Sequence, residues 1–92
     1  MFIDERHKKI VNDILFHYPY HFYAFGSRVK GSQRKFSDLD LCYLEEIPFR
    51  DLRKIVHEFE DSDLPFKVDI VNYNRCTKDF QEQLKKEMLP VD

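Results

Sequence analysis

Cysteine is scarce in this sequence, which has only Cys42 and Cys76 among its 92 residues. Two cysteines are too few for a disulfide scaffold, so we expect a reduced, cytoplasmic setting. No apolar run approaches the roughly 18–20 residues that a membrane helix needs. Charged residues interrupt positions 1–6, where a signal peptide would become apolar. The sequence therefore predicts a soluble protein.

The sequence also lacks an excess of positive charge. Lysine and arginine number 15 against 17 aspartates and glutamates, which leaves a net charge of -2. General nucleic-acid-binding proteins are normally basic, so this balance argues against that class. The 4 histidines have no spacing typical of a zinc site. Because neither a linker nor a repeat interrupts the chain, we expect a single domain over residues 1–92.

Aromatic residues are plentiful by contrast. They make up 15% of the chain, which indicates a core built from large rings. Five of them crowd into one short stretch, as Tyr18, Tyr20, Phe22, Tyr23 and Phe25. Such a cluster is able to stack a nucleotide base, but packing in the core is the favoured interpretation.

Helical periodicity recurs in three segments. The first helix is predicted over residues 4–18, with Asp4 as its N-cap and Pro19 as its stop. A second is predicted over residues 49–60, and a third begins after the cap residue Thr77. The inward side chains of the second helix are predicted to be Phe49, Leu52, Val56 and Phe59.

Strands are predicted between these helices. Apolar runs and alternation indicate strands at residues 20–25, 38–44 and 66–71, with a short turn or helix over 27–31. The order α-β-(α)-β-α-β-α predicts a small α/β (α+β) fold. Both later strands have an aliphatic and an acidic face. We expect helices to cover the aliphatic face and the acidic face to line an open cleft.

Three carboxylates carry the predicted chemistry. Asp38 and Asp40 are two residues apart in a strand and point the same way, and Asp69 lies on the next predicted strand. On a neighbouring strand, its carboxylate would lie roughly 5 Å from theirs. Three uncompensated carboxylates repel one another unless Mg²⁺ or Mn²⁺ bridges them. The pattern predicts a catalytic metal site in which two ions activate a hydroxyl and stabilise a leaving pyrophosphate.

A small turn precedes these carboxylates. Gly26 has no Cβ and so lets the backbone approach phosphates closely, while the Ser27 hydroxyl and nearby amides are able to donate to them. Arg28 and Lys30 are placed to neutralise a triphosphate, and Ser37 is a further candidate donor. The turn is therefore the predicted nucleotide-binding segment.

The run from Gly26 to Gly31, the run from Ser37 to Leu41 and the later Val68-Asp69-Ile70-Val71 together resemble the minimal nucleotidyltransferases of the DNA polymerase β-like superfamily. The resemblance covers nearly the whole chain. It implies a mixed sheet with helices mainly on one face, a metal set of Asp38, Asp40 and Asp69, and triphosphate contacts from the Gly-Ser pair. The family often has arginine where Lys30 stands, and lysine lacks the bidentate phosphate geometry of arginine.

The resemblance also implies a substrate and a partner. Minimal nucleotidyltransferases of this size are typically antitoxins of a helical HEPN RNase toxin, and some transfer AMP from ATP onto a tyrosine of that toxin. We therefore expect Mg²⁺-dependent transfer to a hydroxyl of a partner protein, in a homodimer or hetero-oligomer. Two alternatives stay open: a non-catalytic, nucleotide-binding antitoxin that acts by occlusion, and a module that modifies small molecules or tRNA ends.

Two further features have plain interpretations. Cys42 follows Asp40 on the acidic face and is best read as a small buried thiol. The charge run Lys85-Lys86-Glu87 is most simply the solvent face of the last helix.

Overall fold

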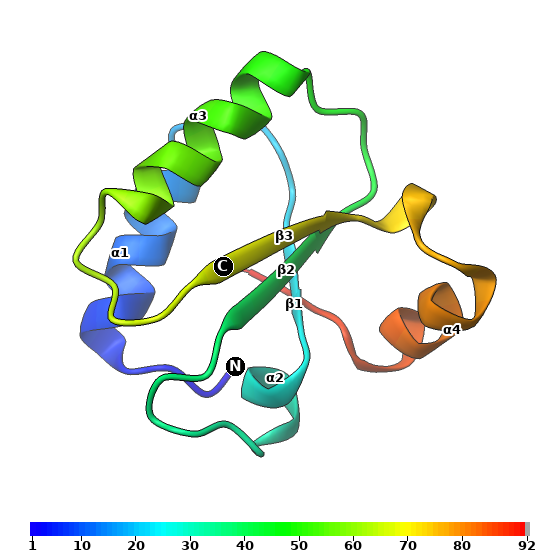
Figure 1. Cartoon of the computed structure of the whole chain (residues 1–92), viewed down its shortest axis with the longest axis horizontal. Coiled ribbons are helices and arrows are strands. Elements are labelled where there is room, and N and C mark those ends of the chain that lie inside the picture. Colours follow the sequence, from blue (N-terminus) through cyan, green and yellow to red (C-terminus); the bar gives the residue numbers. More distant parts are fainter. Residues whose placement is uncertain (92) are drawn as a thin grey trace.

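The computed structural model describes residues 1–91 as a sheet with helices on both sides (Figure 1). The elements follow in the order α1 (Glu5–Leu15), β1 (Tyr23–Phe25), α2 (Ser27–Lys30), β2 (Leu39–Tyr43), α3 (Phe49–Glu60), β3 (Val68–Asn72), the 3-10 turn η1 (Tyr73–Arg75), α4 (Lys78–Glu87) and β4 (Leu89–Pro90). This order confirms the predicted series and adds β4, a short strand that the sequence analysis missed.

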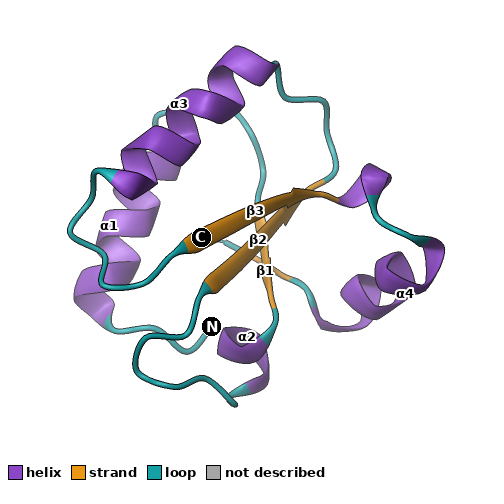
Figure 2. Cartoon of the chain, viewed as in Figure 1, coloured by secondary structure: helices purple, strands orange, loops and turns teal. Residues whose placement is uncertain are grey.

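The sheet is mixed, with the spatial order β3-β2-β1-β4 (Figure 2). β1 runs antiparallel to β2 and β4, whereas β2 and β3 are parallel. A parallel pair needs a crossover, and α3 supplies it. The crossover places Asp40 directly beside Asp69 in the register of the two strands.

The main core lies on the aliphatic face of the sheet, where α1 and α3 pack (Figure 1). Leu39, Leu41 and Tyr43 alternate along β2 and all point into this core. The apolar stripe of α1 meets them with Val11, which is fully buried. This arrangement confirms helices mainly on one face.

The opposite face of the sheet is not open along its whole length, which corrects the expected cleft. A second apolar cluster of Phe25, Cys42, Tyr73 and Leu84 packs α4 against β1, β2 and the turn η1. Figure 1 shows α4 on the other side of the strands from α1 and α3. On this face of the sheet, α4 leaves uncovered only the part that carries the carboxylates. Cys42 is buried in this cluster as expected, and burial raises the pKa of its thiol to about 11.

The ends of the helices follow their caps. Asp4 accepts a hydrogen bond from the Arg6 amide at the start of α1, and Thr77 accepts one from the Phe80 amide at the start of α4, so both predicted caps are confirmed. α1 ends at Leu15, before Pro19, because the next amides turn back to carbonyls three residues earlier. Within residues 1–91, no helix has the length and apolarity to cross a membrane.

The inward face of α3 differs from the prediction. Ile55 and Phe59 are buried and Leu52 packs against them, but Phe49 and Val56 are exposed. Ile55 takes the place in the main core that Val56 was expected to fill. The predicted bounds of this helix, residues 49–60, are confirmed.

Candidate active site

Two adjacent strands bring two of the three predicted carboxylates to one face of the sheet. Asp40 on β2 is the register partner of Asp69 on β3, and Asp38 directly precedes β2. Side chains of register partners lie on the same face, so Asp40 and Asp69 project together, away from the main core. Asp38 and Asp69 are exposed, whereas Asp40 is half-buried between β1 and β3.

Burial and neighbouring charges both act on the carboxyl group of Asp40. Its pKa is raised, first by burial and then by the negative charges of Asp69, Asp38 and Glu87. Both effects disfavour an ionised carboxylate. The site thus holds concentrated negative charge that a cation would relieve.

The donor set fits a hard divalent cation in its chemistry, since carboxylate oxygens are the ligands that Mg²⁺ and Mn²⁺ prefer. It is not a ready-made cage. Among residues 1–91, no group of three histidine, cysteine, aspartate or glutamate side chains is arranged to hold an ion. Like charges on neighbouring carboxylates repel one another, which disfavours a preformed cage in the absence of a cation.

Gly26 lies against the carboxylate of Asp40. It joins β1 to α2 with a φ of +82°, a region that residues with a Cβ rarely adopt. A Cβ at this position would lie 2.4 Å from Asp40 Oδ2. The absence of a side chain is therefore what lets the turn and the carboxylate share this space.

α2 places the other predicted nucleotide contacts beside this turn. Ser27 begins the helix and Lys30 ends it one turn later. The Lys30 ammonium forms an ion pair with Glu87 at the end of α4, with 3.0 Å between Nζ and Oε2. Lys30 is thus held toward the half of the sheet that carries the carboxylates.

Glu87 is a site residue that the sequence analysis missed. Its side chain is only 12% exposed, and its charge contributes to the raised pKa of Asp40, so it does not belong to the solvent face of α4. The signal was present in the spacing, because residue 87 lies three positions after the buried Leu84 and seven after Phe80.

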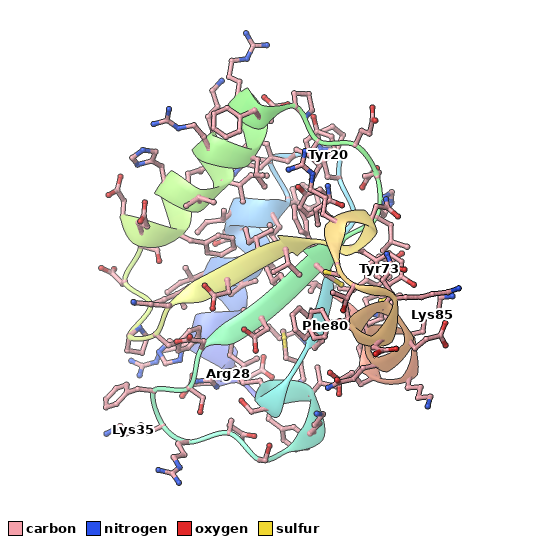
Figure 3. The ribbon with its side chains drawn as sticks, turned by 45° about the vertical axis from the view of Figure 1, so that its right-hand side comes forward. Tyr20, Arg28, Lys35, Tyr73, Phe80 and Lys85 are labelled. Atoms are coloured by element: carbon pink, nitrogen blue, oxygen red, sulfur yellow. The ribbon has the colours of Figure 1, made fainter. Side chains whose placement is uncertain are left out.

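Arg28 has a structural role in place of the expected contact with a triphosphate. Its side chain is buried, and its three nitrogens donate to the carbonyls of Ser37, Phe2 and Lys35. The guanidinium also lies 4.2 Å from the centre of the Phe66 ring. Figure 3 shows Arg28 between α2 and the loop that leads to β2. Arg28 ties this loop and the N-terminal segment to the sheet.

The Arg28→Ala substitution is accordingly expected to lower stability by about 2–4 kcal/mol, because it leaves three part-buried carbonyls without their donor and removes a buried, stacked side chain. Arg34→Ala is the matched control, since Arg34 is exposed in the same loop. Urea denaturation of both variants checks this. Equal midpoints for the two variants would contradict the structural role.

The loop before β2 also carries Ser37 and Lys35, which differ in their contacts. The Ser37 hydroxyl accepts a hydrogen bond of 2.7 Å from the Arg34 amide, which leaves its own proton as a donor. Lys35 extends outward from the loop in Figure 3, with its ammonium 5.4 Å from the Phe36 ring centre. The Ser37 hydroxyl oxygen is therefore engaged by the Arg34 amide within the loop, and its proton remains available for donation.

Comparison with known proteins shows the family. The model of a family described as "Polymerase beta, Nucleotidyltransferase" matches residues 8–89. A curated protein of Haemophilus influenzae, "Probable protein adenylyltransferase MntA", is 42% identical over 69 residues. That match covers 73% of this chain and 60% of the relative, so the chain spans less than two thirds of the relative's length.

Solved structures share the fold. One is a crystal structure of a toxin-antitoxin with AMP-PNP, which matches 92% of this chain and 72% of that chain with a TM-score of 0.69 at 20% identity. Another is a mutant of the toxin-antitoxin MntA-HpeT, with a TM-score of 0.61 at 14% identity over 92% of this chain and 71% of that chain. The predicted fold is confirmed by these matches.

Proposed function

The chain belongs to the polymerase beta nucleotidyltransferase family, and from this premise we propose that it transfers AMP from ATP to a hydroxyl of a partner protein. The observation that carries the proposal is the register pair Asp40 and Asp69, with Asp38 just upstream and the Gly26 turn against Asp40. A phosphate-binding turn beside clustered carboxylates suits an in-line displacement at phosphorus.

Each residue has a role in the proposed reaction. Asp38 and Asp40 hold Mg²⁺ or Mn²⁺, and Asp69 completes the ligand set. The bound ions would neutralise the triphosphate and lower the pKa of the acceptor hydroxyl. The acceptor oxygen forms a bond to the α-phosphorus as the bond between the α-phosphorus and the bridging oxygen breaks, and pyrophosphate leaves. Asp69, which is exposed, takes the proton of the acceptor.

The turn and α2 orient the triphosphate in this proposal. The Ser27 hydroxyl and the first amides of α2 donate to the β- and γ-phosphates. Lys30 exchanges Glu87 for a phosphate oxygen and stabilises the leaving pyrophosphate. Arg28 is left out, because its guanidinium is already bound to backbone carbonyls.

The proposed partner is a helical HEPN RNase toxin, for which this chain is the antitoxin. The support is the named activity of the Haemophilus influenzae relative and the toxin-antitoxin assemblies among the solved structures of the same fold.

A transfer assay tests this function. The protein is incubated with ATP labelled at the α-phosphate, Mg²⁺ and the product of the adjacent gene. We expect label on the partner, and a loss of label with Asp38→Asn/Asp40→Asn. Asp63→Asn is the matched control, because Asp63 is exposed in a turn before β3. An unlabelled partner, or equal labelling by the double variant, rejects the activity.

The same variants separate catalysis from occlusion. A triple variant of Asp38, Asp40 and Asp69 is expected to bind the toxin but to lose its rescue of growth. Full rescue by this variant would favour a non-catalytic antitoxin that covers its partner. Strong labelling of RNA or an aminoglycoside, with weak labelling of the partner protein, would favour a module that modifies small molecules or tRNA ends.

A further inference from the structure

The outer surface of α3 has an apolar edge that nothing in residues 1–91 covers. Phe49 is 73% exposed and Val56 is 36% exposed, with the half-buried Leu52 between them. These three residues, one helical turn apart, define the apolar edge. Single exposed apolar residues are ordinary, but a contiguous row is typical of a contact surface.

A row of cations runs beside the apolar edge. Arg50, Arg53, Lys54 and His57 have the spacing i, i+3, i+4, i+7, so they share one face of α3. These four residues define the basic stripe. All four are exposed, in a chain whose net charge is -2.

Most of the stripe has no internal partner. Within residues 1–91, no carboxylate lies within 4.0 Å of Arg50, Arg53 or Lys54. The neighbouring acids are engaged elsewhere. Asp51 accepts a hydrogen bond of 2.6 Å from the Tyr20 hydroxyl, and Glu58 accepts one from the Tyr18 hydroxyl. The stripe therefore has charge to offer to another molecule.

The two rows adjoin along the helix and are hollowed on both sides. One depression is lined by the apolar edge with Arg53, His57 and Glu60, and a second by the basic stripe with Tyr18, Phe49 and Glu58. Phe49, Arg53 and His57 line both, and the Arg53 guanidinium lies 5.9 Å from the centre of the Phe49 ring. Basic side chains outnumber carboxylates in each lining. A ridge of side chains would fit along each hollow.

We propose that α3 docks an amphipathic acidic helix of a partner protein. The apolar residues of that helix would cover Phe49, Leu52 and Val56, and its carboxylates would pair with the basic stripe. Charge complementarity selects an acidic occupant, and the row of aliphatic side chains selects a protein. RNA fits less well, because single strands bind to successive stacking rings, whereas Phe49 is the one ring of the apolar edge and Leu52 and Val56 are aliphatic.

This surface is separate from the candidate active site. α3 packs on the aliphatic face of the sheet (Figure 1). The register partners Asp40 and Asp69 project from the other face. A partner seated on α3 therefore leaves the carboxylates accessible. The docking surface does not depend on the proposed transferase activity, and binding alone tests it.

The probe is a fluorescein-labelled synthetic helix with leucine at heptad positions a and d and glutamate at e and g. Fluorescence anisotropy measures its binding to the full chain. We expect Arg50→Glu/Arg53→Glu/Lys54→Glu to weaken binding by about tenfold or more, and Phe49→Ser to weaken it by about fivefold or more. The matched control is Arg6→Glu/Lys8→Glu/Lys9→Glu on α1, expected to change binding less than about twofold.

A charge swap keeps the test decisive. The same peptide with lysine in place of glutamate is expected to bind the charge-reversed α3 variant and to avoid the wild type, with circular dichroism confirming that each variant is folded. The proposal is overturned if the α1 variant loses as much binding as the α3 variant. It is also overturned if α3 pairs with a second copy of the chain, seen as self-association that the α3 variant abolishes, or if oligouridine binds α3 more tightly than the acidic peptide.

Discussion

The Asp40→Asn variant is expected to transfer nucleotide about a thousandfold more slowly than the wild type, and yet to unfold at a higher temperature. Asparagine keeps the size of the side chain but offers a neutral, weaker ligand for a divalent cation. It also removes the half-buried charge that is disfavoured by burial and by Asp69, Asp38 and Glu87. Activity and stability should therefore move in opposite directions.

The pH dependence follows from the sign of the pKa shift. The carboxyl of Asp40 has a higher pKa in the folded state than its ordinary value of 3.8. The folded state therefore binds this proton more readily than the unfolded state, and stability is lost as pH rises through the window between those two values. The gain in Tm for Asp40→Asn should be full at pH 7 and should shrink as pH falls through that window.

Scanning calorimetry across pH and the transfer assay at neutral pH check this prediction. Asp63→Asn serves again as control and should leave both readouts near wild type. A lower Tm for Asp40→Asn at neutral pH would contradict the unfavourable half-buried charge at Asp40. Transfer at the wild-type rate would contradict its role as a metal ligand.

The Gly26→Ala variant is expected to lose nearly all transfer activity and about 1–3 kcal/mol of stability. A Cβ would lie 2.4 Å from Asp40 Oδ2, so either the carboxylate or the turn has to move. The φ of +82° adds backbone strain for any residue other than glycine. Both effects fall on the segment proposed to approach the phosphates.

Gly31→Ala provides the matched control for this change. Gly31 has nearly the same φ, +83°, but the nearest atom to an added Cβ is the Phe2 ring at 3.2 Å, well away from Asp40. Chemical denaturation should show a loss for both variants, whereas the transfer assay should show a loss for Gly26→Ala alone. If the two variants keep equal activity, close contact between the turn and Asp40 is not needed for transfer.

Local patterns predicted the elements well where the residues act through near neighbours. The range of α3, the caps at Asp4 and Thr77, and the alternating faces of β2 all follow from interactions within a few residues. Those predictions needed no knowledge of what packs on top. The shared face of Asp38 and Asp40 stays a prediction, because β2 begins at Leu39 and the period of two in a strand does not extend to Asp38.

Other features depended on which segments meet in space. The position of Arg28 beside a Gly-Ser turn predicts a phosphate ligand. Only the folded chain shows that its guanidinium donates to backbone carbonyls instead. Glu87 reads as surface charge until α4 is placed beside β2 and Lys30. The exposed Phe49 and Val56 follow from the rotation of α3 against the core, which amphipathic spacing specifies only to within a residue or so.

The amino-acid sequence by itself determined the order of helices and strands, the identity of the clustered acids and the glycine that a tight turn requires, because these arise from backbone geometry and short-range periodicity. Only the tertiary structure decided that β2 and β3 run parallel with Asp40 beside Asp69, that Glu87 reaches Lys30, and that α3 presents cations to solvent. These outcomes depend on packing between segments far apart in the chain, where many pairings satisfy the same local pattern and burial selects one of them.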